Sequence, residues 1–379
     1  MNKETFCSFP FDTIFLGADS GVKTCCSARQ DLGNLNVNTI ETILNSDISR
    51  EVRESIINNQ WHSQCSQCKE IEDMGGRSER KSNVDERYDL YTEIELDKKY
   101  FKLAKLDLRW SNTCNLACNY CYEYFSSQWS NIKGIKVNTL REDNQESLFL
   151  YIEKHKESVT HVNLLGGEPF LQKQNSRLIS ILKDKQYYVL TNLAVPLENN
   201  KIANKILEEP HSEWGVSFET IGNRYEYVRH NASWDQFIKN IEYVKTRNPS
   251  LTFNAHPLYC SYSAFNLVEF YDFITSNNNF TSVYWCVIQN IEGLNVFKLS
   301  KKLRLKAISE IEKCQAKYST APGIDHLIDI KNNLIISIDD NANKNLEFFK
   351  WTAKIERQLS NKMYSFTDLW PELTNDLKK

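Results

Sequence analysis

The sequence predicts an α/β protein whose parallel sheet closes only part of a barrel. Short apolar runs alternate with segments of helical periodicity, which is the pattern of repeated βαβ units. There are six such runs, and they suit an open, partial (β/α)6 barrel better than a closed barrel of eight strands. We expect the strands within residues 102–111, 161–167, 186–192, 214–220, 251–258 and 282–289, with helices such as 144–157 and 234–247 between them.

Three domains are expected along the chain. Residues 1–98 hold a small cysteine-rich domain that ends in a polar, charged stretch, 74–100, which we interpret as a linker with some local order. The partial barrel follows at residues 99–297. Residues 298–379 show helical periodicity with few turn signals, and they predict a helical C-terminal cap.

Composition and charge narrow the possible functions. The 46 basic and 49 acidic residues give a net charge of -3, so nucleic acid is an unlikely partner and RNA modification is the least favoured activity. No basic leader with an apolar core opens the chain, and no apolar run approaches the roughly 20 residues of a membrane span. We therefore expect a cytoplasmic protein without a membrane partner, whose clustered cysteines bind metal rather than form disulfides.

Three cysteines directly follow the first expected strand. Cys114, Cys118 and Cys121 would converge in a loop at the carboxyl end of that strand, where α/β folds place their sites. Three thiolates suit three irons of a cubane cluster, and the absence of a fourth cysteine nearby leaves one iron open for another ligand. The alternative is a zinc site with one remote ligand, although the CxxxC spacing is unusual for zinc.

These cysteines, with Tyr120, match the motif CxxxCxφC, in which φ is aromatic. From residue 103 to about 290 the chain therefore resembles the radical S-adenosylmethionine (SAM) superfamily, whose barrel is a partial TIM barrel. The resemblance implies a [4Fe–4S] cluster that binds SAM and cleaves it reductively to methionine and a 5′-deoxyadenosyl radical. That radical takes a hydrogen atom from the substrate.

A second motif follows the second expected strand. Gly166, Gly167, Glu168 and Pro169 resemble the family's GGE motif, in which residues without a Cβ let the backbone approach the methionine part of SAM. A zinc site would not explain this motif. The resemblance further implies that Tyr120 packs near the adenine, with Val287 of the sixth strand as a further candidate, and that the SAM carboxylate and ribose are contacted by Asn192, Ser217 and Glu219.

A separate group of cysteines precedes residue 70. A CxxC pair joined by two remote cysteines can close a four-thiolate site for zinc or for [4Fe–4S]. The group resembles the SPASM and twitch modules, which hold auxiliary clusters and usually follow the barrel, whereas here the group precedes it. The resemblance implies a second [4Fe–4S] cluster on Cys7, Cys25, Cys65 and Cys68. Cys26 competes with Cys25, because adjacent residues of a strand point to opposite faces, and the phasing favours Cys25.

The remaining cysteines stand alone. Cys260 follows the fifth expected strand and Cys286 lies in the sixth, so either is a candidate to return a hydrogen atom to a substrate radical, as an epimerase requires. Buried cysteines are more often packing residues, which is also our interpretation of Cys314. Candidate residues at the barrel mouth are Arg224 and Arg229, for an anionic substrate group, and His230 and His256.

The sequence thus predicts an enzyme that abstracts a hydrogen atom from a small polar metabolite, such as a sugar, amino alcohol or amino acid. The auxiliary cluster would assist electron transfer, and a reducing partner such as flavodoxin or ferredoxin would supply electrons. One alternative is a peptide-modifying enzyme, although no leader-peptide-binding module is apparent. The alternative of another class is a non-catalytic iron–sulfur or zinc scaffold.

Overall fold

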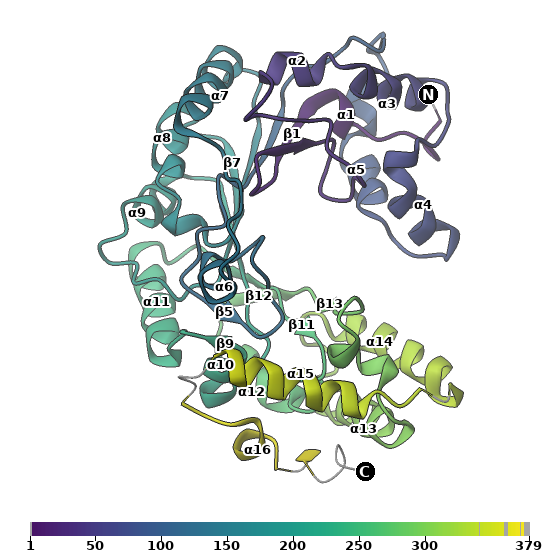
Figure 1. The fold of residues 1–379 in the computed structure, drawn as a ribbon, viewed down its shortest axis with the longest axis vertical. Coiled ribbons are helices and arrows are strands. Elements are labelled where there is room, and N and C mark those ends of the chain that lie inside the picture. The colour runs from purple at the N-terminus through teal and green to yellow at the C-terminus, as the bar shows by residue number, and fades with distance from the viewer. Residues whose placement is uncertain (1, 341, 360–362, 372, 375–379) are drawn as a thin grey trace. The chain divides into compact units, whose positions relative to one another are not determined.

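The computed structural model describes the chain apart from residues 1, 341, 360–362, 372 and 375–379 (Figure 1). The chain forms two compact units. Unit 1 consists of Met1–Thr113, Lys136–Val189 and Glu208–Ser212. Unit 2 consists of Cys114–Ile135, Leu190–Leu207 and Glu213–Lys379.

Unit 1 contains a parallel sheet that continues into a hairpin. Strand β4 (Lys105–Leu108) pairs in parallel with β6 (His161–Leu164), and β6 pairs in parallel with β7 (Gln186–Thr191). The other edge of β4 is occupied by β1 (Thr13–Leu16), also in parallel. From β1 the sheet continues antiparallel through β2 (Gly21–Lys23) and β3 (Gly33–Asn34). The N-terminal segment therefore adds strands to the sheet that contains the first expected barrel strands.

The helices of unit 1 come from both parts of the chain. Helices α7 (Glu142–His155) and α8 (Gln174–Ile181) connect the parallel strands, as the alternating pattern predicts. The shorter N-terminal helices are α1 (Phe9–Asp12), α2 (Ile40–Leu44), α3 (Asp47–Ile57), α4 (Ser66–Asp73) and α5 (Glu79–Arg87), with 3₁₀ turns at Ser63–Cys65, Tyr88–Tyr91 and, later in the chain, Pro169–Leu171.

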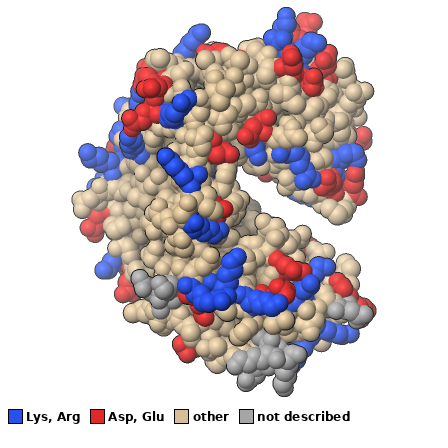
Figure 2. Space-filling view, in the orientation of Figure 1, with Lys and Arg blue, Asp and Glu red and all other residues tan. Residues whose placement is uncertain are grey.

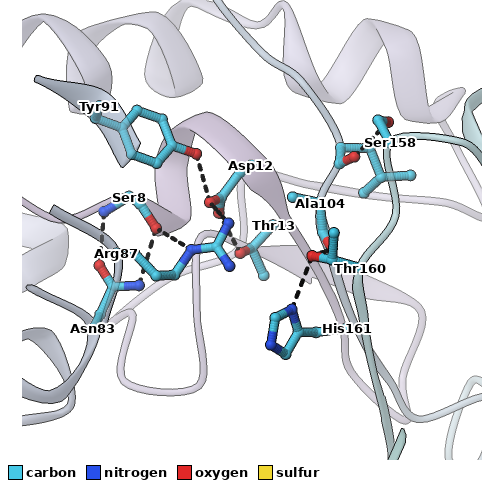
Figure 3. A network of polar contacts seen from close by, with 11 residues as sticks. Ser8, Asp12, Thr13, Asn83, Arg87, Tyr91, Ala104, Ser158, Thr160 and His161 are labelled. Atoms are coloured by element: carbon cyan, nitrogen blue, oxygen red, sulfur yellow. Dashed lines mark hydrogen bonds and ion pairs between the residues drawn. The ribbon is translucent and has the colours of Figure 1, made fainter. Parts of the chain in front are cut away.

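The stretch interpreted as a linker is largely a structural part of unit 1. Helix α5 begins where the Ser78 side chain accepts a hydrogen bond from the Lys81 amide. Figure 3 shows how its polar side chains turn inward: Asn83 accepts from the Ser8 amide at 2.8 Å. Asp12 receives the guanidinium of Arg87 at 2.7 Å and the hydroxyl of Tyr91 at 2.6 Å. The expectation of a linker was wrong for residues 79–91, because Asn83 and Arg87 in this stretch bind buried groups of the folded unit.

Unit 2 contains the other three expected strands. Strand β10 (Phe253–Ala255) pairs in parallel with β8 (Ser212–Val216) on one side and with β12 (Phe280–Val283) on the other. All six expected strands are therefore present and the parallel α/β class is confirmed. The helices that go with them are α6 (Ser127–Lys133), α9 (Lys201–Glu208), α10 (Gly222–Val228), α11 (Trp234–Arg247) and α12 (Leu267–Ser276).

The fifth and sixth runs are shorter in the sheet than the sequence predicts. After Pro257, which has no N–H to donate to a ladder, the chain forms a separate parallel pair of β11 (Leu258–Tyr259) and β13 (Cys286–Val287). Val287, expected in the sixth strand, lies in this separate pair. A third small ladder joins β5 (Ala117–Cys118) antiparallel to β9 (Arg229–His230).

The C-terminal part is helical, as predicted. It contains α13 (Lys301–Lys317), α14 (Ile324–Ile336), α15 (Asn345–Gln358) and α16 (Phe366–Leu369), with 3₁₀ turns at Glu292–Leu294, Val296–Lys298 and Ser337–Asp339. Aromatic contacts hold α15 and α16 in unit 2: Phe348 lies 5.4 Å from Tyr262 and 5.3 Å from Phe366, centroid to centroid.

Candidate functional site

The three-cysteine loop of unit 2 is compact and mostly buried. Cys114 and Cys118 are each 8% exposed and pack with Leu116, whereas Cys121 is only partly buried. The Cys121 amide donates to the Cys118 carbonyl at 2.9 Å, and the Cys114 amide donates to the Ser127 hydroxyl at 3.1 Å. The loop thus places the three thiols by local backbone geometry.

The electrostatics of this loop suit a cationic group. Burial raises the pKa of Cys118, and burial together with the neighbouring Cys118 thiol raises the pKa of Cys121 to about 12. Thiols in such a place ionise when a metal centre compensates their charge. Three cysteines packed together in one loop fit the three protein ligands of a [4Fe–4S] cluster that leaves one iron open.

Polar side chains of unit 2 border the loop just after β7 and β8 end. The Asn192 amide nitrogen lies 3.8 Å from the Cys114 sulfur and donates to the Asn115 side chain at 2.9 Å. Ser217 follows β8, and its amide donates to the Thr191 carbonyl at 2.9 Å. The fold therefore places Asn192 against the cysteine loop, and it ties Ser217 to the end of β7.

Tyr120, Glu219 and Arg229 form a buried polar group. The Tyr120 hydroxyl lies 3.1 and 3.2 Å from the two oxygens of the Glu219 carboxylate, and an Arg229 nitrogen lies 2.6 Å from one of them. The side chains of Arg229 and Glu219 are 4% and 0% exposed. Burial opposes the charge of Arg229, but Glu219 raises the pKa of Arg229 well above its usual value. Arg229, a candidate for an anionic substrate group, is therefore engaged by Glu219.

The other barrel-mouth candidates are placed as follows. Arg224 forms an ion pair with Glu269 at 2.7 Å and donates to the Leu369 carbonyl at 3.0 Å, so it anchors α16. His230 lies in β9 and is half-buried. Burial lowers the pKa of His256 to about 4, and this imidazole is neutral at pH 7.

The glycine turn of unit 1 is pressed against the chain just before the cysteine loop. Gly166 has a φ of 126°, a conformation that other residues rarely adopt. A Cβ on Gly167 would lie 2.4 Å from the Thr113 carbonyl oxygen. The Glu168 amide donates to the same oxygen at 2.8 Å, and Pro169 begins the next turn. Both glycines are therefore required by the backbone itself.

Four cysteines of the N-terminal group face one cavity in unit 1. These are Cys7 before α1, Cys25 after β2, Cys65 at the end of a 3₁₀ turn and Cys68 in α4. Cys26 is exposed and does not line the cavity. Burial and then the neighbouring Cys25 and Cys65 thiols raise the pKa of Cys7. Across the described part of the chain, no three His, Cys, Asp or Glu side chains come close enough to share a single metal ion. The four cysteines fit a larger group, a cluster held by four thiolates, because all four line the same cavity.

The cavity is also lined by a positively charged side chain that the sequence analysis did not identify. Arg80 lines it, forms an ion pair with Glu72 at 2.5 Å and donates to the Lys3 and Phe6 carbonyls at 2.8 and 3.0 Å. Its side chain is 6% exposed. Arg80 lies in a run of charged residues, which is typical of a solvated surface, so no sequence signal marks it.

Unit 1 has a polar row on one face of its sheet, which the sequence analysis also missed. Asp107 of β4 is in register with Asn163 of β6, and Asn163 with Tyr188 of β7. An Arg109 nitrogen lies 2.6 Å from the Asp107 carboxylate, and the Asn163 amide nitrogen lies 3.4 Å from it. The sequence did contain a signal for this row, namely the alternation of polar and apolar residues in β4. The apolar residues 106 and 108 are fully buried and point to the opposite face.

The isolated cysteines differ in exposure. Cys260 is fully buried, its pKa is raised to about 12 by burial, and its sulfur lies 3.9 Å from the Ser263 hydroxyl. Cys286 is exposed in β13. Cys314 is buried in α13 and packs against the Leu267 carbonyl. The hydrogen-donor role of Cys260 and Cys286 stays a prediction.

No helix in the described ranges combines the length and apolar character that crossing a bilayer requires.

Two family models match the chain. Residues 108–274 match the radical SAM superfamily, and residues 7–69 match SPASM, an iron-sulfur cluster-binding domain. Together the two matches contain both groups of cysteines, and the SPASM match precedes the radical SAM match, as the sequence predicts. The second match decides for iron–sulfur rather than zinc in the first group. The comparison with curated proteins finds no match.

Several solved structures resemble parts of the chain at low identity. SuiB of Streptococcus suis bound to precursor peptide SuiA is 13% identical with a TM-score of 0.42, covering 68% of this chain and 61% of SuiB. SuiB bound to S-adenosylmethionine is 15% identical with a TM-score of 0.40, covering 72% and 61%. TYW1 with a lysine-pyruvate adduct is 14% identical with a TM-score of 0.31, covering 54% and 70%. The chain thus spans about 61% of the length of the SuiB chains.

Proposed function

We propose that the chain is a radical SAM enzyme with an N-terminal iron–sulfur cluster-binding domain, and that it abstracts a hydrogen atom from a small polar molecule. The observation that carries the choice of substrate is the polar row on the sheet of unit 1. The side chains of Asp107 and Arg109 keep 13% and 15% exposure and are already oriented by each other, and Asn163 lies beside them. A fixed carboxylate, guanidinium and amide suit hydroxyl, amino or carboxyl groups of a small substrate.

The cysteine loop would hold the SAM-binding cluster. Cys114, Cys118 and Cys121 are its proposed ligands, and the bound [4Fe–4S] cluster with SAM supplies the electron and the deoxyadenosyl radical that the reaction needs. Asn192 would hold the Cys114 side of the loop in place through its contacts at 3.8 and 2.9 Å. Tyr120, fixed by Glu219, would present its ring to the adenine.

The remaining SAM contacts are proposed from their places in each unit. Gly166 and Gly167 would leave the backbone of the turn open to the methionine part of SAM, because neither position carries a Cβ. Glu168 and Pro169 would fix the turn that carries them. Ser217, at the end of β8, would donate to the SAM carboxylate or ribose.

The first cysteine group would hold an auxiliary [4Fe–4S] cluster. Cys7, Cys25, Cys65 and Cys68 are its proposed ligands, and four protein thiolates leave no iron open for substrate. Its proposed role is therefore electron transfer during product formation. We also propose that residues 1–98, 99–297 and 298–379 act as the cluster domain, the catalytic domain and the helical cap.

The first test counts iron and SAM cleavage. Anaerobic iron and sulfide analysis with electron paramagnetic resonance is expected to give about eight irons in the wild type and about four in a C114A/C118A/C121A variant, with SAM cleavage abolished. About four irons falling to none would show that the first group binds no cluster. Wild-type protein that holds iron and does not cleave SAM under reduction would contradict the proposed reaction.

The second test addresses the substrate class. We expect D107N and R109Q to keep slow, substrate-independent SAM cleavage but to lose hydrogen transfer to a small polar substrate, followed by deuterium incorporation from a labelled panel. E142Q, which breaks an exposed ion pair of unit 1 with Lys173, is the control. Deuterium transfer from peptides alone would overturn the small-molecule proposal in favour of a peptide-modifying enzyme.

A further inference from the structure

Helix α15 lies directly against the three-cysteine loop within unit 2. The Trp351 indole nitrogen donates to the Asn119 carbonyl at 3.1 Å, and Asn119 lies between Cys118 and Tyr120. Ile355 and Leu359 share a buried cluster with Ala117 and Trp129 of the loop region, and Cys121 and Trp351 pack at its margin. One face of α15 therefore covers the loop, although more than two hundred residues separate them in the chain.

The opposite face of α15 is cationic. Lys350, Lys354 and Arg357 are exposed, and their spacing of four and three residues aligns them along one side of the helix. Figure 2 shows Lys and Arg side chains gathered over α15. We call these three residues the α15 cationic face. The Lys354 nitrogen lies 5.5 Å from the centre of the Trp351 ring, so the face reaches the same residue that contacts the loop.

The nearby acidic residues leave this face positive. Glu356 points inward, where its carboxylate accepts from the Tyr227 hydroxyl at 2.9 Å and from the Phe366 amide at 2.7 Å. Glu347 forms an ion pair with Lys350 at 3.1 Å. Among the described residues, no carboxylate forms an ion pair with Lys354 or Arg357. A net positive surface therefore exists on a chain whose overall charge is -3.

The part of the cysteine loop beside α15 is also its most accessible part. Cys121 is the partly exposed member of the three cysteines, and the following residue, Tyr122, is 44% exposed. On the outer side of α15, Leu346 and Phe349 are 57% and 37% exposed. Charged side chains around a few apolar ones, beside an accessible redox ligand, are the composition of a small, transient interface.

We propose that the α15 cationic face is the docking surface for the electron donor, an acidic one-electron carrier protein. The inference rests on the proposed assignment of Cys114, Cys118 and Cys121 as ligands of the SAM-binding cluster. In the step it serves, the reduced carrier loses one electron and the cluster gains it, and that electron is used to break the carbon–sulfur bond of SAM. The cations would steer the carrier and set the encounter rate, which is the main effect of complementary charge at an interface.

The test uses the cluster-loaded enzyme and fully reduced flavodoxin as the probe. In K350E/K354E/R357E, flavodoxin-driven SAM cleavage at low ionic strength is expected to slow at least ~10-fold, because charge steering is worth that much or more. Dithionite-driven cleavage and iron content are expected to stay at wild-type values. The matched control is K239E/K245E/R247E, which makes the same charge change on exposed positions of α11 in the same unit.

Each outcome has a defined meaning. The wild-type rate with flavodoxin is expected to fall as ionic strength rises, and a flat salt dependence would overturn the proposal without any variant. Equal slowing in both triple variants would show a general charge effect and would also overturn it. Wild-type protein that fails to cleave SAM with dithionite would instead refute the proposed function. If the triple variant loses iron, the single variant K354E must show reduced flavodoxin-driven cleavage for the proposal to stand.

Discussion

The two cysteine groups of this chain reach their sites in different ways. Cys114, Cys118 and Cys121 lie within one short loop, and a backbone hydrogen bond of 2.9 Å already links Cys121 to Cys118. The N-terminal four are spread from residue 7 to residue 68 and meet only where a strand end, a 3₁₀ turn and α4 surround one cavity. A local loop can form its site whenever its neighbours are folded. The site of the four N-terminal cysteines, which we call the dispersed site, depends on the complete fold of the N-terminal segment.

The largest expected effect is the loss of iron when Cys25 of the dispersed site, rather than the adjacent Cys26, is changed. We expect C25A to lose the auxiliary cluster, about four irons, because Cys25 faces the cavity, while the cluster of the cysteine loop remains. C26A, at an exposed position, is the matched control and should keep all iron. Iron analysis with electron paramagnetic resonance distinguishes the two. Loss of iron in C26A alone would reverse the ligand assignment.

The second prediction tests how strongly the dispersed site depends on the buried polar contacts of unit 1. R87M leaves the Asp12 carboxylate, 1% exposed, without its guanidinium, and an unpaired buried charge costs about 3–5 kcal/mol. We expect chemical denaturation to release the auxiliary cluster at a lower denaturant concentration, with the loop cluster released later. R77M, which breaks the exposed Arg77–Asp85 pair, should cost at most about 1 kcal/mol.

The double variant D12N/R87M supplies the control for this result, because it removes the stranded charge and should recover part of the lost stability. Equal denaturation midpoints for R87M and R77M would contradict the idea that the dispersed site relies on the buried network of Figure 3.

This comparison also explains what the sequence could predict. The six strands were predicted because apolar runs and helical segments alternate, and the cysteine loop was predicted because its ligands are close together in sequence. The parallel pairing of β1 with β4 was not, because nothing in the local sequence of β1 specifies which strand it pairs with. The inward turn of Asn83 and Arg87 was missed for a related reason: a charged stretch gives the same pattern whether its partners are water or buried side chains.

Long-range contacts form the second class of missed features. The hydrogen bond from Trp351 to Asn119 joins α15 to the cysteine loop, and no pattern in either segment predicts it. The helical character of α15 was predicted, whereas its position required the tertiary structure. The site was therefore predictable at the level of its ligands and motifs, and its supporting contacts were not.

A smaller effect is expected at the glycine turn of unit 1, which contacts Thr113. G167A would place a methyl group 2.4 Å from the Thr113 carbonyl oxygen, so the turn must shift. We expect SAM affinity to fall at least ~10-fold, about 1.4 kcal/mol, with iron content unchanged. G134A is the control for backbone strain without a clash, since Gly134, unlike Gly167, has a positive φ of 65° and nothing lies within 4 Å of its added Cβ. Equilibrium SAM binding of both variants decides the question, and equal affinities would show that the turn tolerates a Cβ.

The smallest effect should come from the polar neighbour of the cysteine loop. N192A removes the amide that lies 3.8 Å from the Cys114 sulfur, while Asn115 loses a neutral partner that water can replace. A hydrogen bond to a cluster thiolate stabilises the more negative, reduced state. We therefore expect the loop cluster's reduction potential to become more negative by about 20–60 mV, equivalent to a hydrogen bond of about 0.5–1.5 kcal/mol. Redox titration followed by electron paramagnetic resonance would measure the shift, with the auxiliary cluster of the same molecule as an internal control. An equal shift in both clusters would mean that Asn192 acts on the fold as a whole, and no shift would mean that the loop places its thiols without this contact.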